Sequence, residues 1–363
     1  MLISEPPDVS VLMAVRNGGD HLRPAVQSIL DQTFTRFEFV IVDDGSTDDT
    51  PAVLDSFTDP RIRRLHNPVN LGLPASLNRG LSACGAPLIA RMDGDDLAEP
   101  ARLAEQLDWL RARPHAAGCG TWTTEIDEHD AVIGFWRPSG HAAYLKFKLA
   151  FTNPIYHPTL LLRREAFDAV NGYDETYRYA QDYDLMTRLY AAGRDVGILE
   201  MPLLRYRRCS GSITRAHGGE QARLAEGIRR RYRTWLLGRA LSPDAEAALD
   251  ALMAYDRSPA PESLRNALDA LQAVVDATVG IPGTPADARA AVEAEVLHLL
   301  RPKADRLLGG APVLAHHYAR FLRRLPGRRG EGWRLHARAA LCALGRARRG
   351  QPQVASSLPD GAA

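Results

Sequence analysis

Three short clusters of acidic residues stand out in this chain of 363 residues. Each follows an apolar or aromatic stretch, and the clusters are Asp43-Asp44-Gly45-Ser46, Asp93-Gly94-Asp95-Asp96 and Gln181-Asp182-Tyr183-Asp184. Separate strands of one α/β sheet would bring such clusters to a single crevice at the strand ends. Several carboxylates in one place favour a hard divalent cation, which is commonly held by one or two carboxylates and the phosphates of a substrate. The chemistry first indicated is that of an enzyme acting on a nucleotide or a sugar nucleotide.

The segments around the first two clusters read as alternating strands and helices. Apolar, β-branched runs of strand length alternate with stretches that have helical spacing and helix-start signals. We expect strands over 9–15, 37–42, 61–65 and 87–92, and helices over 20–32, 74–83 and 100–113. This alternation predicts an α/β fold with a largely parallel sheet and right-handed crossovers.

The pattern changes further along the chain. Two β-type runs between residues 118 and 136 flank a polar stretch and predict a hairpin. We also expect a strand over 154–162, helices over 163–170 and 183–192, and Ala-, Leu- and Arg-rich helices from about residue 220. We therefore predict three parts, with boundaries at 1–219 for the α/β domain, 220–349 for a helical C-terminal region and 350–363 for a disordered tail.

The bulk composition is that of a water-soluble globular protein. Hydrophobic residues make up 45% and charged residues 25% of the chain, which favours neither disorder nor a membrane class. The first residues lack the basic and apolar regions of a signal peptide. The four cysteines lie far apart, which argues against a zinc site and a disulfide framework. We expect a cytoplasmic location, and nothing predicts a nucleic-acid partner.

The net charge of +1 conceals a basic C-terminal segment. Residues 301–363 contain 13 Lys or Arg and 3 Asp or Glu. The simplest interpretation is that these arginines cover the solvated faces of amphipathic helices. A second hypothesis is peripheral contact with an anionic membrane at its inner face, or with an anionic lipid-linked acceptor.

Several motifs, in order, give the chain a family resemblance over residues 8 to about 215. They are VSVLMAVRNGGDHLRPAVQSILDQTF (9–34), FVIVDDGSTDDT (39–50), NLGLPASLNRGL (70–81), IARMDGDDLAEPARLAEQ (89–106), NPIYHPTLLLRREAF (153–167) and GYDETYRYAQDYDLMTRL (172–189). The segment resembles a family 2 inverting glycosyltransferase with the GT-A fold, a Rossmann-like nucleotide-diphospho-sugar transferase fold. Each motif alone would be a weak signal, and their combination is a strong one.

The resemblance implies a nucleotide-sugar site at the first two clusters. Asp44 would accept a hydrogen bond from a uracil ring, and Asp43 would shape the base and ribose pocket. Asp93 would lie near the ribose, and Asp95 would bind a divalent metal, Mn²⁺ or Mg²⁺, that bridges the two phosphates. The backbone near three further residues would lie against the nucleotide, namely Ala14, Val15 and Arg16.

The third cluster is expected to supply the catalytic base. An acceptor hydroxyl must lose its proton as it attacks the donor sugar, which calls for a carboxylate. Asp182 matches the second position of the family's Glu-Asp pair, and Gln181 replaces the Glu. His157, Arg207 and Arg208 are candidates for acceptor or diphosphate contacts. Cys209 stands where many relatives have His, and a thiol suits Mg²⁺ or Mn²⁺ poorly.

Other interpretations of the same residues stay open at this point. The stretch 43–47 alone is compatible with an Asx turn and a helix cap, Asp182 with a cap of the following helix, and His157 with a structural role. A phosphatase of the haloacid-dehalogenase type would need a second Asp where Gly45 stands. The resemblance favours sugar transfer from a nucleotide donor, UDP-linked, to a hydroxyl of a glycan or lipid-linked acceptor in cell-surface polysaccharide assembly. The alternative is a non-catalytic sugar-nucleotide or glycan binding protein.

Overall fold

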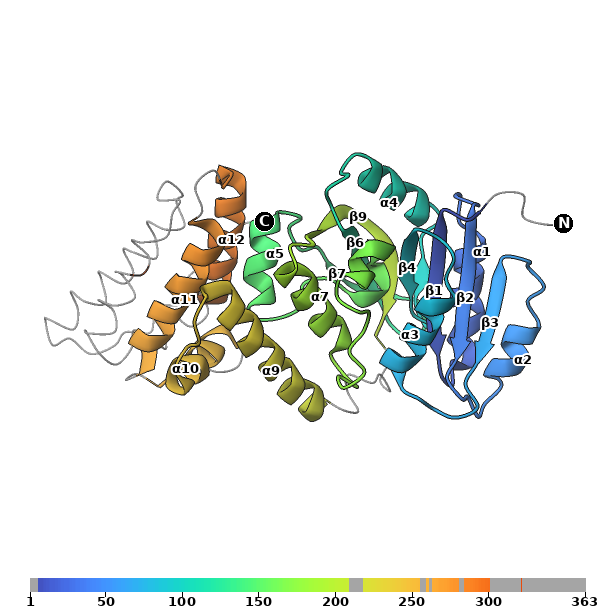
Figure 1. Ribbon diagram of the computed structural model, residues 1–363, viewed down its shortest axis with the longest axis horizontal. Helices are drawn as coiled ribbons and strands as arrows, with labels where there is room; N and C mark the ends of the chain where they lie inside the picture. The colour runs from blue at the N-terminus through green and yellow to red at the C-terminus, as the bar shows by residue number, and fades with distance from the viewer. Residues whose placement is uncertain are drawn as a thin grey trace, which may run out of the picture. The chain divides into compact units, whose positions relative to one another are not determined.

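The chain divides into two compact units, Met1–Arg239 and Ala240–Ala363. The structure is a computed structural model, and it describes residues 6–208, 218–254, 259–260, 263–280, 284–300 and 321. The first unit combines strands and helices, whereas the described part of the second is helical (Figure 1). The predicted α/β class with a helical C-terminal region is therefore confirmed.

Four parallel strands form one half of the sheet in the first unit. Their order is β3-β2-β1-β4, and the bounds are β1 (Val9–Val15), β2 (Phe37–Asp43), β3 (Ile62–His66) and β4 (Leu88–Met92). All seven residues of β1 are buried, as expected of a parallel strand covered on both faces. These strands match the four predicted from the sequence. Because they are parallel, the residues that follow β1, β2 and β4 emerge at the same edge of the sheet.

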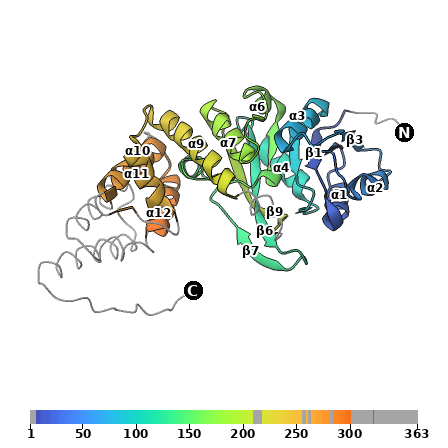
Figure 2. The ribbon, with the colours of Figure 1, turned by 90° about the horizontal axis from the view of Figure 1, so that it is seen from below.

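The other half of the sheet is mixed. β8 runs antiparallel to β4 and to β6, β9 runs parallel to β6, and β5 runs antiparallel to β9. The predicted hairpin is confirmed: β6 and β7 pair antiparallel and extend from the body of the unit (Figure 2). The bounds are β5 (Leu97–Ala98), β6 (Gly118–Ile126), β7 (Val132–Trp136), β8 (Leu161–Arg163) and β9 (Val196–Arg207).

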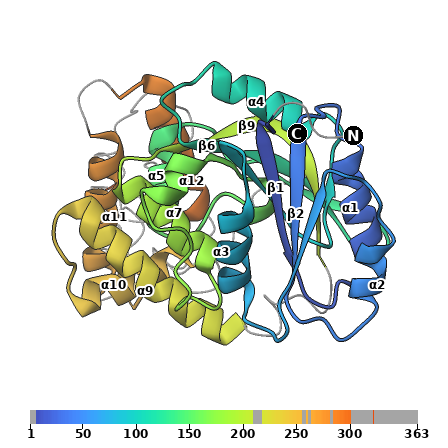
Figure 3. The ribbon, with the colours of Figure 1, turned by 45° about the vertical axis from the view of Figure 1, so that its right-hand side comes forward.

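Helices cover both faces of the parallel strands. α1 (Leu22–Leu30) packs on the face formed by Val9, Val11 and Met13, and α3 (Leu73–Ala83) packs on the opposite face (Figure 3). The remaining described helices of this unit are α2 (Thr50–Asp55), α4 (Arg102–Arg111), α5 (Ala142–Leu149), α6 (Arg164–Asp168), α7 (Gln181–Ala191) and α9 (Gly218–Leu237), with 3-10 turns η1 (Gly19–His21) and η2 (His157–Thr159). No helix in the described part of the chain has the length and apolar character needed to cross a membrane.

The packing of α3 depends on a glycine in its last turns. A Cβ atom at Gly80 would lie 2.3 Å from Cδ1 of Leu12 and 3.0 Å from Cγ2 of Val42, both buried in the sheet. At Gly227 in α9, a Cβ atom would meet nothing within 4 Å. Close approach of helix and sheet, rather than a turn, therefore explains the glycine at position 80.

We expect opposite effects from the same substitution at these two helical glycines. Gly80→Ala should lower the free energy of unfolding by about 1–3 kcal/mol, because the added methyl group overpacks the core. Gly227→Ala should raise it by about 0.5–1 kcal/mol, because alanine loses less backbone entropy in a helix. Urea unfolding of both variants measures the difference. Equal effects at the two positions would contradict the close packing of α3.

One predicted strand is wrong in most of its length. Residues 154–162 were expected to be extended, but they contain the turn η2, and only Leu161 and Leu162 join β8. Pro154 and Pro158 lack the N–H that a strand needs for its ladder, so the apolar character of this segment serves burial and not pairing. The sequence interpretation also missed α5 and β9.

The second unit contains three described helices. They are α10 (Pro243–Met253), α11 (Leu264–Val279) and α12 (Ala286–Leu300). α10 begins at Ser242, whose Oγ accepts a hydrogen bond from the N–H of Ala245 at 3.2 Å. Helix α9 belongs to the first unit, which ends at Arg239. The boundary between the α/β domain and the helical region, expected after residue 219, stays a prediction. The basic segment from residue 301 and the tail 350–363 lie outside the described residues, apart from Phe321.

Candidate active site

The loop after β4 concentrates three carboxylates. Burial raises the pKa of Asp95 to about 6, and the charge of Asp93 contributes in the same direction. Burial and the charges of Asp95 and Asp93 raise the pKa of Asp96 well above its usual range. The N–H of Arg207 donates to Oδ1 of Asp96 at 2.8 Å, while Oδ2 has no hydrogen-bond partner among the described residues. The loop therefore holds negative charge that the protein only partly compensates.

A buried arginine lies beneath this loop. Arg91 is 3% exposed, and its guanidinium donates to the carbonyl oxygen of Met92 and to Oδ1 of Asp93. Its Nε has no partner in the described part of the chain. Arg91 orients Asp93 from inside the sheet. The sequence analysis missed this residue, although a charged side chain within the apolar run 88–92 was a visible signal.

Asp44 organises the loop that follows β3. Its Oδ1 accepts from Nδ2 of Asn67 and from the N–H of Leu71, both at 2.8 Å, and its Oδ2 accepts from the N–H of Gly72 at 2.9 Å. Burial alone would raise the pKa of Asp44, but the hydrogen bonds from Asn67, Leu71, Ser76 and Gly72 outweigh it and hold the pKa below its ordinary value. Asp44 is thus a buried carboxylate that stays ionised and fixes the loop 67–72.

Asp43 and the residues after β1 belong to a second set of loop contacts. Oδ1 of Asp43 accepts a hydrogen bond from the N–H of Ser46 at 3.0 Å. This bond forms the Asx turn that was one interpretation of residues 43–47. Oδ2 of Asp43 lies 3.0 Å from Nδ1 of His66. The carbonyl of Val15 accepts from the N–H of Asp44 at 2.8 Å. Ala14 and Val15 are buried at the end of β1, and Arg16 is exposed where the chain leaves the sheet.

We expect Asp44→Ala to destabilise the first unit. Three donors would lose a charged acceptor, so the free energy of unfolding at pH 7 should fall by about 2–4 kcal/mol. Because the pKa of Asp44 is lowered in the folded state, its contribution is present above the ordinary pKa and is lost as the pH falls through the lowered one. Urea unfolding at neutral and acidic pH tests this. Asp49→Ala, at an exposed acid in the same loop, is the control and should change little.

Asp182 lies in the first turn of α7. The helix begins after Ala180, which adopts the left-handed conformation (φ 60°) and turns the chain sharply into the helix. Nδ2 of Asn153 donates to Oδ2 of Asp182 at 2.9 Å. Burial raises the pKa of Asp182, the bond from Asn153 opposes that shift, and the charge of Asp93 adds to it. The charge of Asp93 therefore acts on a carboxylate of the second cluster, Asp95, and on one of the third, Asp182.

The three residues predicted to contact the acceptor or the diphosphate, His157, Arg207 and Arg208, differ in how many hydrogen bonds they already make within the protein. Nε2 of His157 lies 2.8 Å from the hydroxyl of Tyr173, and burial, with the charge of Arg91, holds the pKa of His157 well below its usual range. The Arg207 guanidinium donates to the carbonyls of Asp95 and Asp127 at 2.8 Å and pairs with Asp130 at 2.6 Å.

Arg208, by contrast, keeps about half of its side chain exposed. It pairs with Glu125 at 2.5 Å and donates to the hydroxyl of Tyr156 at 2.9 Å. Cys209 lies outside the described residues. His157 and Arg207 therefore act within the protein's own hydrogen-bond network, and Arg208 is the member of this group that is open to solvent.

Comparison with known proteins shows the family to which the chain belongs. The family model described as Glycosyl transferase family 2 matches residues 10–170. EpsE of Bacillus subtilis, named as a glycosyltransferase, is 32% identical over 214 residues, which cover 58% of this chain and 76% of that protein. The chain belongs to glycosyltransferase family 2. It is therefore a transferase enzyme.

Two further similarities support the assignment. The amylovoran biosynthesis glycosyltransferase AmsE of Erwinia amylovora is 27% identical over 213 residues, covering 58% of this chain and 79% of that protein. The crystal structure of residues 1–349 of TarS from S. aureus, in complex with UDP-GlcNAc, matches with a TM-score of 0.54 at 15% identity. That match covers 95% of this chain and 92% of the other, and it shows the GT-A fold.

The acidic loop of this glycosyltransferase fits a divalent metal that is held largely by substrate. Among the described residues, no group of three or more His, Cys, Asp or Glu side chains is arranged to hold a metal ion by itself. Yet Asp93 and Asp95 raise the pKa of Asp96, and a cation would relieve their repulsion. One or two carboxylates plus phosphates is the usual coordination of Mg²⁺. The donor set therefore suits a metal–diphosphate complex.

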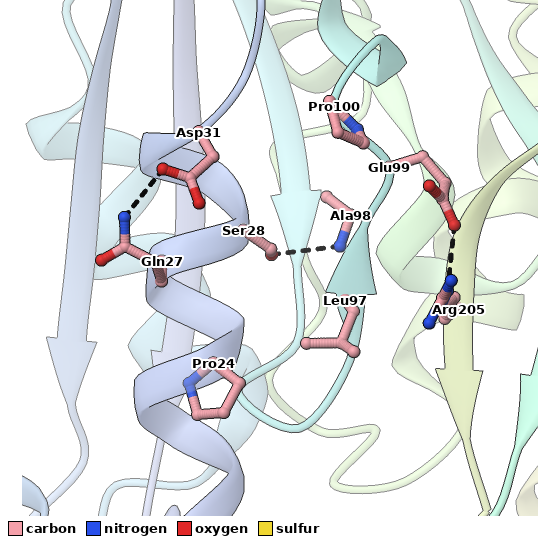
Figure 4. A pocket seen from close by; sticks show the side chains of 9 residues that line it. All are labelled: Pro24, Gln27, Ser28, Asp31, Leu97, Ala98, Glu99, Pro100 and Arg205. Atoms are coloured by element: carbon pink, nitrogen blue, oxygen red, sulfur yellow. Dashed lines mark hydrogen bonds and ion pairs between the residues drawn. The ribbon is translucent and has the colours of Figure 1, made fainter. Parts of the chain in front are cut away.

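A surface groove of about 370 Å³ lies elsewhere on the first unit. It runs between α1 and the strand β5, and Figure 4 shows that the ion pair between Glu99 and Arg205 and the hydrogen bond from the N–H of Ala98 to Ser28 bridge parts of its wall. None of the predicted site residues lines it. The groove is therefore separate from the acidic loops.

Proposed function

We propose that this glycosyltransferase transfers a sugar, with inversion at the anomeric carbon, from a nucleotide-sugar donor to a hydroxyl of a glycan or lipid-linked acceptor. We further propose that the donor is linked to UDP. The observation that carries the proposal is the placement of Asp182, a carboxylate of raised pKa that is oriented by Asn153 and lies within electrostatic reach of Asp93.

Asp182 is suited to act as the general base. A base must be ionised at the working pH and yet basic enough to accept a proton, and burial moves the pKa of Asp182 in that direction. The hydrogen bond from Asn153 fixes Oδ2 of Asp182, and the residue is only partly buried, so we propose that an acceptor hydroxyl reaches the carboxylate from its exposed side. A single displacement by that hydroxyl, on the face of the sugar opposite the leaving group, inverts the anomeric configuration.

The other acidic residues would bind the donor. Asp95 would hold Mn²⁺ or Mg²⁺ together with the diphosphate, with Asp93 near the ribose. When bound, the metal stabilises the charge that develops on the leaving diphosphate. The base and ribose would lie against the ends of β1 and β2 and the residues that follow, namely Ala14, Val15, Arg16, Asp43 and Asp44.

The biological setting we propose is the assembly of a cell-surface polysaccharide. It is supported by the relatives in the comparison, one of which is named for amylovoran biosynthesis. We propose a cytoplasmic location for the donor chemistry, where nucleotide sugars would meet an acceptor on the inner face of the membrane. The hypothesis that the basic segment contacts anionic lipid concerns residues outside the described part of the chain.

The function is tested by release of UDP from a panel of UDP-sugars with Mn²⁺ or Mg²⁺. We expect metal-dependent release from one donor, because transferases of this kind pass sugar slowly to water in place of the acceptor. The anomeric configuration of the released sugar, read by NMR immediately after turnover, tests inversion. If UDP neither binds nor is released from any donor, while a GDP- or dTDP-sugar is turned over, the UDP assignment is wrong and the transferase assignment stands.

A further inference from the structure

Three aromatic side chains from different segments form a stack beside the proposed base. Trp136 of β7 and Tyr156, which precedes η2, have ring centroids 5.7 Å apart and planes inclined by only 12°. Tyr156 also contacts Tyr206 of β9, with centroids 4.5 Å apart. All three rings are partly exposed. Tyr206 is inclined by 36° to Tyr156 and packs against the core of the sheet, so the stack runs from that core to the β6–β7 hairpin.

The backbone ties this stack directly to Asp182. Nε1 of Trp136 donates to the carbonyl of Pro154 at 2.8 Å, and the preceding residue, Asn153, donates to Asp182. The indole and the proposed base are therefore held by consecutive residues of one short segment.

The other end of the stack reaches the acidic loop. The N–H of Arg207, the residue after Tyr206, donates to Oδ1 of Asp96 at 2.8 Å. The guanidinium of Arg207 donates to the carbonyl of Asp95 at 2.8 Å. The stack therefore connects the segment that holds the base with the loop proposed to bind the diphosphate, and it combines one residue each of β7 and β9 with Tyr156, which precedes η2.

We propose that Trp136, Tyr156 and Tyr206 are the binding platform for the acceptor, and that the acceptor residue placed on it is a neutral pyranose. This inference rests on the proposed function and adds the class of acceptor. Aromatic faces carry partial negative charge and attract the C–H bonds on the apolar face of a sugar ring. At the rim, the Tyr156 hydroxyl and the Glu125–Arg208 pair can exchange hydrogen bonds with sugar hydroxyls.

The charge balance of the rim favours a neutral ring over an anionic acceptor. Arg208 is neutralised by Glu125 at 2.5 Å, and the Tyr156 hydroxyl donates to the same carboxylate at 2.8 Å. Arg207, next to Tyr206, is paired with Asp130. Arg137, which follows β7, lies over the ring of Phe135, 4.4 Å from its centroid. Because side chains alternate along a strand, Phe135 lies on the face of β7 opposite to Trp136.

The test is saturation-transfer NMR with methyl glycosides of glucose, galactose, mannose and N-acetylglucosamine, and with glycerol phosphate as an anionic probe, in the presence of UDP and diamagnetic Mg²⁺. We expect at least one glycoside to bind the wild type through its ring C–H protons. Trp136→Ala should weaken that binding about tenfold, the value of one aromatic contact of this kind, and Trp136→Phe should keep most of it. Tyr206→Leu, at the other end of the stack, should also weaken it.

Phe135→Ala is the matched control, because it removes an aromatic ring 55% exposed on the other face of the same strand. It should leave glycoside binding unchanged. The platform is refuted if no glycoside binds the wild type, if Trp136→Ala and Phe135→Ala behave alike, or if only glycerol phosphate binds. UDP release from the donor panel is measured on the same samples. If the wild type releases UDP from none of the donors, the proposed function is overturned. If Trp136→Ala still releases UDP but binds the glycoside more weakly, the platform is supported.

Discussion

Asp182→Asn should reduce sugar transfer by about 10² to 10⁴-fold while the affinity for UDP stays unchanged, because a general base contributes about that much to catalysis. The amide keeps the size of the side chain and can still contact Asn153, but it cannot accept the proton of the acceptor hydroxyl. Initial rates of transfer and calorimetric titration with UDP and Mn²⁺ measure the two quantities. Asp168→Asn, at an exposed carboxylate at the end of α6, is the control and should retain full activity.

The pH profile distinguishes a base from a carboxylate that only caps α7. Transfer should fall as the pH drops through the raised pKa of Asp182, because only the ionised form accepts a proton. The hydrogen bond from Asn153 lowers that pKa, so Asn153→Ala should raise it and move the acid limb of kcat/KM to higher pH. A capping role predicts a loss of thermal stability in Asp182→Asn with no movement of the acid limb in Asn153→Ala.

The sequence predicted the parts of the fold that depend on local pattern. β1, β2 and β4 are mostly apolar because both faces of a parallel strand are buried, and two of the acidic clusters stand at the ends of β2 and β4. By contrast, β9 contains Glu200, Pro202 and Arg205, and its register with β6 shifts around Trp122. The pairing of β9 with β6 depends on tertiary contacts, so no local sequence pattern predicted this strand.

The site shows the same limit. The positions of Asp44, Asp95 and Asp182 could be predicted from the motifs, but their surroundings are formed by residues far away in the chain. Asn153 contacts Asp182 across 29 residues, and the Arg207 N–H contacts Asp96 across 111. Such contacts decide which carboxylates have raised pKa values and which are only structural. The motifs therefore identify the acidic residues, whereas the contacts made in the folded protein determine the pKa of each carboxylate.

Asp95→Asn should abolish metal-dependent transfer, with a loss of about 1,000-fold, because a metal on the leaving diphosphate contributes several kcal/mol to the transition state. The variant should also lose the stabilisation that Mn²⁺ and UDP together give to the wild type. Thermal unfolding with and without Mn²⁺ and UDP measures the second effect. Asp31→Asn, at an exposed acid after α1, should behave as the wild type in both assays.

The same substitution should stabilise the protein when no metal is present. Since the pKa of Asp95 is raised from 3.8 to about 6, its ionised form is disfavoured in the folded state, and the metal-free protein should lose stability as the pH rises from the first value to the second. At pH 8, Asp95→Asn removes this cost, so its metal-free free energy of unfolding should exceed that of the wild type by about 1–3 kcal/mol.

Stabilisation of the wild type by Mn²⁺ and UDP should weaken below pH 6, where protons compete with the metal for Asp95. A metal-free variant that is no more stable than the wild type at pH 8 would mean that the acidic loop is not strained by its own charge. The metal would then have to be bound through the phosphates without help from Asp95.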